Sequence, residues 1–329
     1  MRRREFIALA GGAAISWPRA ARAQQAQRLR RVSVLMLYPE DDPRGQARAR
    51  AFRETLEKLG WTDGRNIQID YQWGAGDPEW VRTTIAQMVK SAPDVIVSNG
   101  GQTVLALQQA TRTIPVVFIG GADLRADGVV ESLARPGGNF TGFMVLEPSQ
   151  GTKLLGLLKE LAPRLKRVAV MIRPDNAGAG RLADAVAAAG GKLGVASVTA
   201  PVRDEAEIEA VLLKLATEPD SGLIVPPDPT VISHRKLIVE LAARYRLPAI
   251  YGVREIIAEG GLIAYGVDFP ELFRQAAGYA DRVLRGAKPG DLPVQAPTKF
   301  ELAINMKTAK ALGLEVPQTL LVAAAEVIE

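Results

Sequence analysis

The chain has 329 residues, no cysteine, one histidine and a formal net charge of +5. The lack of cysteine excludes disulfides, thiol catalysis and thiolate-bound metal, and a single histidine excludes a multi-histidine metal site. A Ser-His-Asp triad would have His234 as its only possible base. The length favours two domains.

Residues 1–23 have the pattern of an export signal. Two arginines at 3–4 precede Glu-Phe-Ile, an apolar stretch covers 7–17, and Ala-Arg-Ala at 21–23 forms a small-residue cleavage site. This order predicts a twin-arginine export signal. The apolar stretch is shorter than the roughly 20 residues that a membrane span needs. We therefore expect a soluble periplasmic protein that starts at Gln24.

Most of the positive charge belongs to this signal. Residues 1–23 carry five arginines and one glutamate, a net of +4, which leaves about +1 for the rest. No Lys/Arg stripe remains, so we expect no nucleic-acid partner. The G-x-G-x-x-A run at 178–183 does not follow its strand directly, and P-loop and nucleophile-elbow motifs are missing from the sequence. We read 178–183 as a helix start and expect no cofactor.

Short β-rich runs alternate with amphipathic stretches along the chain. In the first half the predicted strands are 32–37, 66–73, 94–98, 115–119 and 141–146, with helices at 45–59, 79–90 and 102–112. A second series of alternating elements follows, with strands at 167–172, 193–199, 222–225, 249–251 and 262–265 and helices at 180–189, 204–216, 230–245 and 271–284. This alternation predicts an α/β protein with two similar Rossmann-like lobes, each built on a parallel sheet.

Pro/Gly-rich runs indicate where the chain passes between the lobes. The run at 135–139 precedes a strand that leads to a crossing near Glu147, and 288–293 marks a later connection. We expect an N-terminal lobe of residues 31–146 plus about 270–290 and a C-terminal lobe of 147–269. Residues 291–329 are expected to form the last crossing and a C-terminal helix.

The turns that follow predicted strands supply the candidate ligand-binding residues. The run 98–103 leaves a buried strand and opens a helix, so its glycines and free N–H groups favour an anion such as a carboxylate. An ordinary capped turn is the alternative. The turns at 120–123, 226–230, 251–252 and 265–268 also end strands, where ligands of open α/β sheets lie.

Acidic and aromatic side chains in these turns suggest further contacts. Asp228 and Asp268 would receive an ammonium group, unless they only cap the helices that follow. Tyr251 and Tyr265 would stack on an apolar side chain. The complete candidate set is Tyr38, Ser98, Asn99, Gly100, Gln102, Thr103, Gly121, Asp123, Asp228, Tyr251, Tyr265 and Asp268.

Three segments are distinctive of a known family: 132–142 (SLARPGGNFTG), 246–251 (RLPAIY) and 297–314 (PTKFELAINMKTAKALGL). Through them the mature chain resembles the ABC-transporter substrate-binding proteins of the tryptophan/tyrosine type. The resemblance implies a type I periplasmic-binding (Venus-flytrap) fold, with two lobes joined by three crossings and a ligand in the cleft. The acidic run 38–42 and the turn 98–101 depart from the family pattern, so the relatives' ligand is not carried over.

Together these features predict the solute-binding component of an ABC importer. It would bind an amino acid or related small carboxylate and deliver it, as a monomer, to an inner-membrane permease. Two alternatives stay open: a periplasmic sensor that hands its ligand to a receptor, and an exported α/β enzyme using His234 or paired carboxylates. The effector domain of a transcription regulator would need a helix-turn-helix where the export signal stands.

Overall fold

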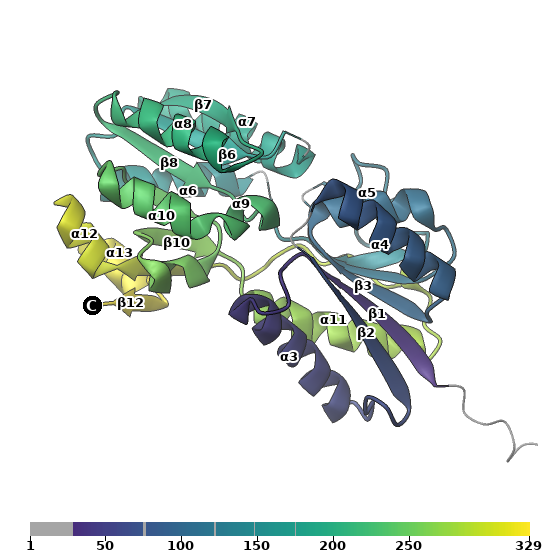
Figure 1. Ribbon diagram of the computed structural model, residues 1–329. Coiled ribbons are helices and arrows are strands. Elements are labelled where there is room, and N and C mark those ends of the chain that lie inside the picture. The colour runs from purple at the N-terminus through teal and green to yellow at the C-terminus, as the bar shows by residue number, and fades with distance from the viewer. Residues whose placement is uncertain (1–28, 75–76, 122, 148, 175) are drawn as a thin grey trace, which may run out of the picture.

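The computed structural model describes residues 29–74, 77–121, 123–147, 149–174 and 176–329 and contains two α/β lobes (Figure 1). The export signal predicted for residues 1–23 lies outside the described residues. Within those described, no helix is both long and apolar enough to cross a membrane. The two-lobed α/β architecture predicted from the alternating pattern is confirmed.

The first lobe is built on a five-stranded parallel sheet. Its order is β2-β1-β3-β4-β5, with Val32 of β1 opposite Val95 of β3. The strands are β1 (Arg30–Met36), β2 (Ile67–Trp73), β3 (Val95–Asn99), β4 (Val116–Ile119) and β5 (Phe140–Phe143). The helices between them are α3 (Pro43–Lys58), α4 (Pro78–Ser91) and α5 (Gly101–Ala110).

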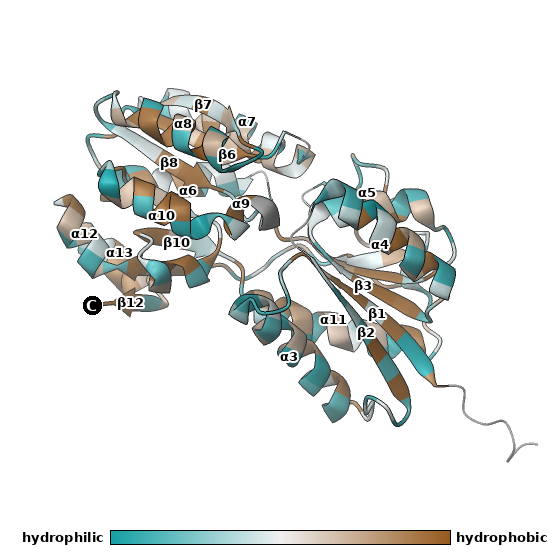
Figure 2. Cartoon of the chain, in the orientation of Figure 1, coloured by the Kyte–Doolittle hydropathy of each residue, from teal (hydrophilic) through white to brown (hydrophobic). Residues whose placement is uncertain are grey.

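Both faces of this sheet are covered, and successive strand residues enter different cores. Val34 belongs to the core that includes Phe52 of α3, whereas its neighbour Leu35 belongs to the core with Ile85 of α4 and Leu107 of α5. Figure 2 shows the resulting hydrophobic strands beneath amphipathic helices. A parallel sheet buried on both sides needs such continuous apolar strands.

The second lobe contains a seven-stranded sheet in the order β12-β11-β10-β9-β8-β6-β7. Its strands are β6 (Arg167–Ile172), β7 (Ala196–Pro201), β8 (Ser221–Val225), β9 (Ala249–Tyr251), β10 (Ile263–Gly266), β11 (Glu301–Asn305) and β12 (Glu326–Ile328). All neighbours are parallel except β10 and β11. The helices are α6 (Ser149–Leu161), α7 (Ala177–Leu193), α8 (Glu205–Ala216), α9 (Pro229–Ser233), α10 (Arg235–Arg244), α12 (Met306–Leu312) and α13 (Gln318–Ala323), with the 3-10 turn η1 (Arg254–Glu259). A second 3-10 turn, η2 (Pro289–Asp291), contacts β5 of the first lobe.

The chain passes between the lobes three times. It leaves the first sheet after β5, returns between β10 and α11 (Phe269–Leu284), and leaves again between η2 and β11. Helix α11 packs against α3 and the strands of the first sheet. The first and third crossings run side by side, because the Met144 N–H donates to the Gln295 carbonyl at 2.9 Å. Three adjacent connections of this kind form a hinge about which two lobes can move.

Several predicted elements differ from the structure. The helix expected over 230–245 is two helices, because the chain breaks at His234 before α10 begins. The strand expected over 141–146 stops at Phe143. The strand expected from 193 starts at Ala196, since α7 continues to a left-handed cap at Gly194 (φ 65°). Helix α6 and strands β11 and β12 were not predicted.

Candidate functional site

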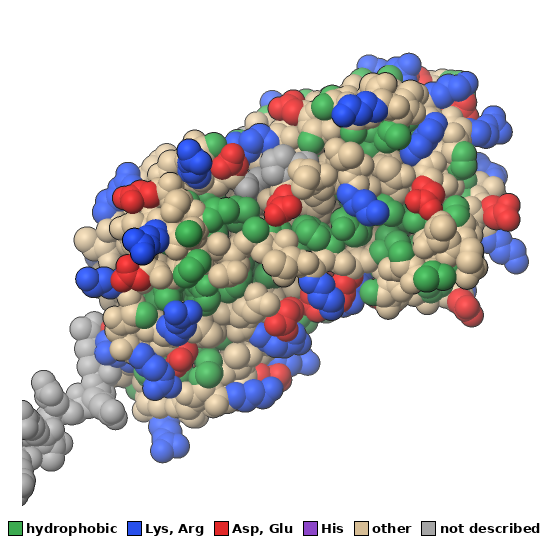
Figure 3. Space-filling model, turned by 180° about the vertical axis from the view of Figure 1, so that it is seen from behind, with side chains coloured by type: hydrophobic (Ala, Val, Ile, Leu, Met, Phe, Trp, Pro, Cys, Tyr) green, Lys and Arg blue, Asp and Glu red, His purple; other side chains and the backbone are tan. Residues whose placement is uncertain are grey.

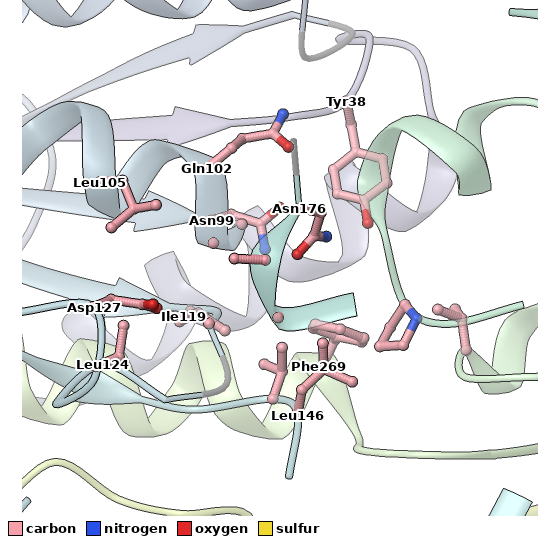
Figure 4. Close-up of a pocket in the computed structure, with 18 residues that line it drawn as sticks. Tyr38, Asn99, Gln102, Leu105, Ile119, Leu124, Asp127, Leu146, Asn176 and Phe269 are labelled. Atoms are coloured by element: carbon pink, nitrogen blue, oxygen red, sulfur yellow. The ribbon is translucent and has the colours of Figure 1, made fainter. Parts of the chain in front are cut away.

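A cavity lies between the two lobes at the carboxyl ends of their strands (Figure 4). Its wall on the side of the first lobe and first crossing is formed by Tyr38, Asn99, Gly100, Gly101, Gln102, Leu105, Ile119, Gly121, Leu124, Asp127, Val145 and Leu146. Asn176, Ala177, Gly178, Pro227 and Val253 of the second lobe and Phe269 at the start of α11 complete it. The lining combines an apolar surface with a few amides and one carboxylate, the composition typical of a small-molecule site.

Two glycine turns bring backbone close to the cavity. A Cβ added to Gly120 would lie 2.7 Å from the carbonyl carbon of Gly100, so only glycine allows the turns after β3 and β4 to touch. Helix α5 begins at this contact with Gly100 as its N-cap and without a side-chain cap. Its first N–H groups therefore face the cavity with the partial positive charge of a helix N-terminus.

Asn99 adds an amide beside this helix start. Its residue is 2% exposed, and its Oδ1 atom has no hydrogen-bond partner in the described part of the chain. A buried polar atom without a partner costs free energy. Because Asn99 lines the cavity, a ligand donor such as an ammonium group can satisfy this acceptor.

The opposite wall is held by a polar pair in the second lobe. Asn176 caps α7 by accepting the Ala179 N–H at 3.1 Å, and its Nδ2 donates to Asp228 Oδ2 at 2.6 Å. Asp228 is fully buried and also accepts the Val231 N–H at 3.1 Å at the start of α9. Asp228 therefore orients Asn176 from behind the cavity wall.

Two ion pairs connect side chains of the first lobe with side chains of the second. Arg181 of α7 binds Asp127 of the first lobe through two contacts of 3.1 Å. In the second pair, Arg235 of α10 lies 3.8 Å from Asp42 of the first lobe, and its Nε also donates to Glu259 at 2.7 Å.

Asp42 is held in its charged form by its neighbours. Burial acts to raise the pKa of Asp42, but the hydrogen bonds and charge of Arg44, together with Arg235, lower it below its usual value. Arg44 donates from Nε at 3.0 Å and from Nη2 at 2.6 Å. A carboxylate that receives such donors stays ionised, which preserves its attraction to Arg235 across the interlobe boundary.

Five of the twelve candidate residues line the cavity: Tyr38, Asn99, Gly100, Gln102 and Gly121. Two more from the same turn lie behind it. Ser98 and Thr103 are fully buried, and the Thr103 hydroxyl donates to the Gly100 carbonyl at 2.6 Å. Thr103 therefore fixes the turn instead of facing the cavity.

The other five candidates lie away from the cavity lining. Asp123 accepts the Ala126 N–H within its turn at 3.1 Å, and Asp228 is buried as described above. Tyr251 is 1% exposed, and burial raises the pKa of its phenol. Tyr265 stacks on Phe300 at 5.3 Å, and Asp268 caps α11 through the Glu271 N–H at 3.0 Å. The helix-capping alternative describes what Asp228 and Asp268 do here.

Sequence reasoning missed several lining residues. Asp127 lies in an irregular stretch without periodicity, so no local pattern points to it. Asn176 precedes α7, where an N-cap signal was present but the helix was expected to begin later. Gly178 comes from the run 178–183, which is the helix start we expected and also lines the cavity.

Among residues whose placement is described, no cluster of three His, Cys, Asp or Glu side chains can hold a metal ion. On the face shown in Figure 3, Lys and Arg side chains are interspersed with Asp and Glu. His234 sits on the surface, where its Nδ1 lies 3.2 Å from Glu205.

Two α/β lobes, three crossings and an interlobe cavity together define a type I periplasmic binding protein. Residues 34–328 match the model of a family described as ABC transporter substrate-binding proteins, and the chain belongs to that family. The family expected from the sequence is thereby confirmed. It is a family of solute-binding proteins, which confirms the prediction that the chain is not an enzyme.

Individual relatives agree with this assignment. The chain is 27% identical over 287 residues to a tyrosine-binding protein of Clostridioides difficile, covering 86% of this chain and 80% of that one. A Streptococcus pneumoniae ABC domain in complex with L-Trp has a TM-score of 0.83 and 25% identity, covering 91% and 99% of the two chains. A conserved domain protein of Vibrio cholerae has a TM-score of 0.84 and 28% identity, and the match covers 91% of this chain and 100% of that one.

Proposed function

We propose that this chain is the periplasmic solute-binding component of an ABC importer and that it binds an aromatic or other large apolar amino acid. The observation that carries the proposal is the interlobe cavity, where the uncapped start of α5 and the unpartnered Asn99 Oδ1 lie beside an apolar wall. Relatives that bind tyrosine and L-Trp support the same ligand class.

The arrangement suggests how an amino acid would lie in the cavity. Its carboxylate would accept N–H groups at the start of α5, as anions do at helix N-termini. Its ammonium group would donate to Asn99 Oδ1. Its side chain would then contact the apolar residues Leu124, Leu146 and Phe269 and the Tyr38 ring. Every polar group of the ligand backbone has a partner in this placement.

Closure of the lobes would convert binding into a signal for the permease. A ligand that contacts both lobes shifts the equilibrium between the open and closed protein towards the closed state. The size of the shift equals the difference between the ligand's binding free energies for the two states. The closed protein would present both lobes to the membrane permease, whose ATPase supplies the energy for transport. The protein itself performs no covalent chemistry in this scheme.

The ligand class is tested by thermal unfolding and calorimetric titration with L-tryptophan, L-tyrosine, L-phenylalanine, L-leucine and L-alanine. A ligand at 100 times its dissociation constant stabilises the folded state by about 2.7 kcal/mol, which raises the melting temperature visibly. We expect the largest shifts with the aromatic members of this panel and none with L-alanine. If none of these amino acids changed the melting temperature, the proposed ligand class would be wrong.

We also propose twin-arginine export and a monomeric state in the periplasm. Residues 1–23 fused to a folded reporter should direct it to the periplasm, and changing Arg3 and Arg4 to lysine should stop this. Light scattering of the purified protein should give a mass near that of one mature chain. Cytoplasmic retention of the fusion, or a dimer mass, would contradict the corresponding proposal.

A further inference from the structure

Arg48 of α3 is a buried charge in contact with the aromatic part of the cavity wall. Its residue is 0% exposed. Its guanidinium carbon lies 4.7 Å from the ring centre of Tyr38 and 3.9 Å from that of Phe269. Its Nη1 donates a hydrogen bond of 2.6 Å to the Tyr38 hydroxyl. Both aromatic residues line the cavity, whereas Arg48 lies behind them.

Stability alone does not explain an arginine at this position. The Nε and Nη2 atoms of Arg48 have no hydrogen-bond partner among the residues that the structure describes. The nearest carboxylate oxygen, Glu255 Oε1, is 3.7 Å from Nη2 and belongs to the second lobe. Burying a charge with so few partners is costly, and apolar replacements of buried ion pairs are often neutral or stabilising. The arginine therefore needs a role that an apolar side chain would not fill.

The two rings that Arg48 contacts come from separate parts of the chain. Tyr38 follows β1, and Gly45 allows α3 to pack against it, because a Cβ at Gly45 would lie 3.0 Å from the Tyr38 Cβ. Phe269 begins α11, directly after the second crossing. A planar guanidinium can contact an aromatic face and donate a directed hydrogen bond at once. Arg48 thus joins the first lobe's cavity wall to the hinge region.

We propose that Arg48 is a positioning residue, which holds the Tyr38 phenol and the Phe269 ring in the orientation that the ligand side chain contacts. The proposal rests on the proposed function, since it assigns Arg48 to that same site. The contact with Glu255 extends the arrangement across the lobes. When the lobes close, the Glu255 carboxylate can take up the unpartnered Nη2 donor, so the orientation of the rings is fixed in the closed state.

The test measures L-tryptophan affinity by calorimetry for Arg48→Met, Tyr38→Phe and the double variant. We expect each single change to weaken binding about tenfold, the effect of losing one hydrogen bond to a charged group. Because Arg48 acts through Tyr38, the double variant should bind no more weakly than Arg48→Met alone. Arg50→Met, an exposed arginine on the same helix, is the matched control and should bind as the wild type does.

The outcomes separate the two proposals. If the wild type and Arg50→Met do not bind L-tryptophan, the ligand assignment has failed, and the same variants are then compared with the panel amino acid that does bind. If both bind and Arg48→Met retains wild-type affinity, the role of Arg48 is refuted. Additive losses in the double variant would also refute the proposal, because they would show that Arg48 and Tyr38 contribute to binding independently of each other. If Arg48→Met does not fold, the Tyr38→Phe variant becomes the test, because it removes only the hydroxyl that accepts the Arg48 hydrogen bond. Wild-type affinity of Tyr38→Phe for L-tryptophan would then contradict the proposal.

Discussion

Arg181 and Asp127 form a two-pronged ion pair that joins the two lobes beside the interlobe cavity. Both guanidinium–carboxylate contacts are 3.1 Å, and the side chains are 28% and 16% exposed. Asp127 also lines the cavity. Paired contacts of this geometry are stronger than single surface ion pairs. The pair therefore stabilises the arrangement in which the two lobes enclose the cavity.

Replacing Arg181 with glutamine should weaken ligand binding by favouring the open protein. Loss of a partly buried two-pronged ion pair costs about 1–2 kcal/mol, which corresponds to about a five- to thirtyfold rise in dissociation constant. The rise should come mainly from faster dissociation, and small-angle scattering of the ligand-bound variant should show a larger radius of gyration.

The control for this change is Arg203→Gln. Arg203 forms an ion pair with Glu207 within the second lobe, with a side chain that is 64% exposed. Losing that pair should leave both affinity and scattering unchanged. Equal effects of the two substitutions would show that the Arg181 pair has no special role in closure.

Gly120→Ala should disrupt the part of the cavity wall that the turns after β3 and β4 form. The added Cβ would lie 2.7 Å from Gly100 C and 2.8 Å from Gly101 N, which is too close for any real contact. Separating the two turns should cost about 1–3 kcal/mol of unfolding free energy and displace the start of α5. We expect a lower melting temperature and weaker amino-acid binding.

Gly278→Ala, in the middle of α11, provides the comparison for Gly120. An added Cβ there meets nothing within 4 Å, so alanine should leave stability equal or raised by up to about 1 kcal/mol. If Gly120→Ala behaved like Gly278→Ala, the contact between the turns would not matter for the site.

Much of the fold was accessible to sequence reasoning because parallel strands buried on both faces read as continuous apolar runs. Strands such as β3 and β8 contain only buried residues and were predicted within one residue. The C-terminal strands were missed for a physical reason. β11 pairs antiparallel with β10, which departs from the βα alternation, and β12 is largely exposed.

The site was only partly accessible because position at a strand end does not determine where a side chain points. The carboxyl end of β3 places Asn99 at the cavity, whereas its neighbour Ser98 is fully buried and does not line it. Tyr265 ends its strand as expected, yet it packs on Phe300 of the third crossing. Asp127 reaches the site through its pairing with Arg181, a relationship over 54 residues that no local pattern reveals.

Asp228→Ala should affect both stability and binding, although Asp228 does not line the cavity. It would remove the cap on the Val231 N–H and leave the Asn176 amide without its acceptor. We expect a loss of about 2 kcal/mol in unfolding free energy. Because Asn176 faces the cavity, ligand affinity should fall as well, which calorimetry would measure.

Asp204→Ala distinguishes these two effects. Asp204 caps α8 through the Glu207 N–H at 2.9 Å and is not among the residues that line the cavity. Its loss should cost about 1 kcal/mol of stability without changing affinity. Unchanged affinity in Asp228→Ala would mean that Asn176 keeps its position without this carboxylate.

Asp42 should make folding stability depend on pH in the acid range. Burial opposes its charge, but Arg44 and Arg235 lower its pKa in the folded protein below the value of about 3.9 expected when unfolded. A group with a lowered pKa contributes stability that is fully present above the unfolded value and is lost as pH falls through the folded value. Stability from Asp42 should therefore be constant near neutral pH and decline below about pH 4.

The melting temperatures of the wild type and Asp42→Asn, measured from pH 7 to pH 3, test this dependence. The variant should melt at a lower temperature at pH 7, and the two curves should converge as Asp42 becomes protonated in the wild type. Other carboxylates, such as Glu301, whose pKa is lowered by its hydrogen bond with Lys299, titrate equally in both proteins and cancel in the difference. Asp41→Asn changes the exposed neighbour and should follow the wild-type curve. A constant difference between wild type and Asp42→Asn at every pH would mean that the charge of Asp42 contributes nothing to stability.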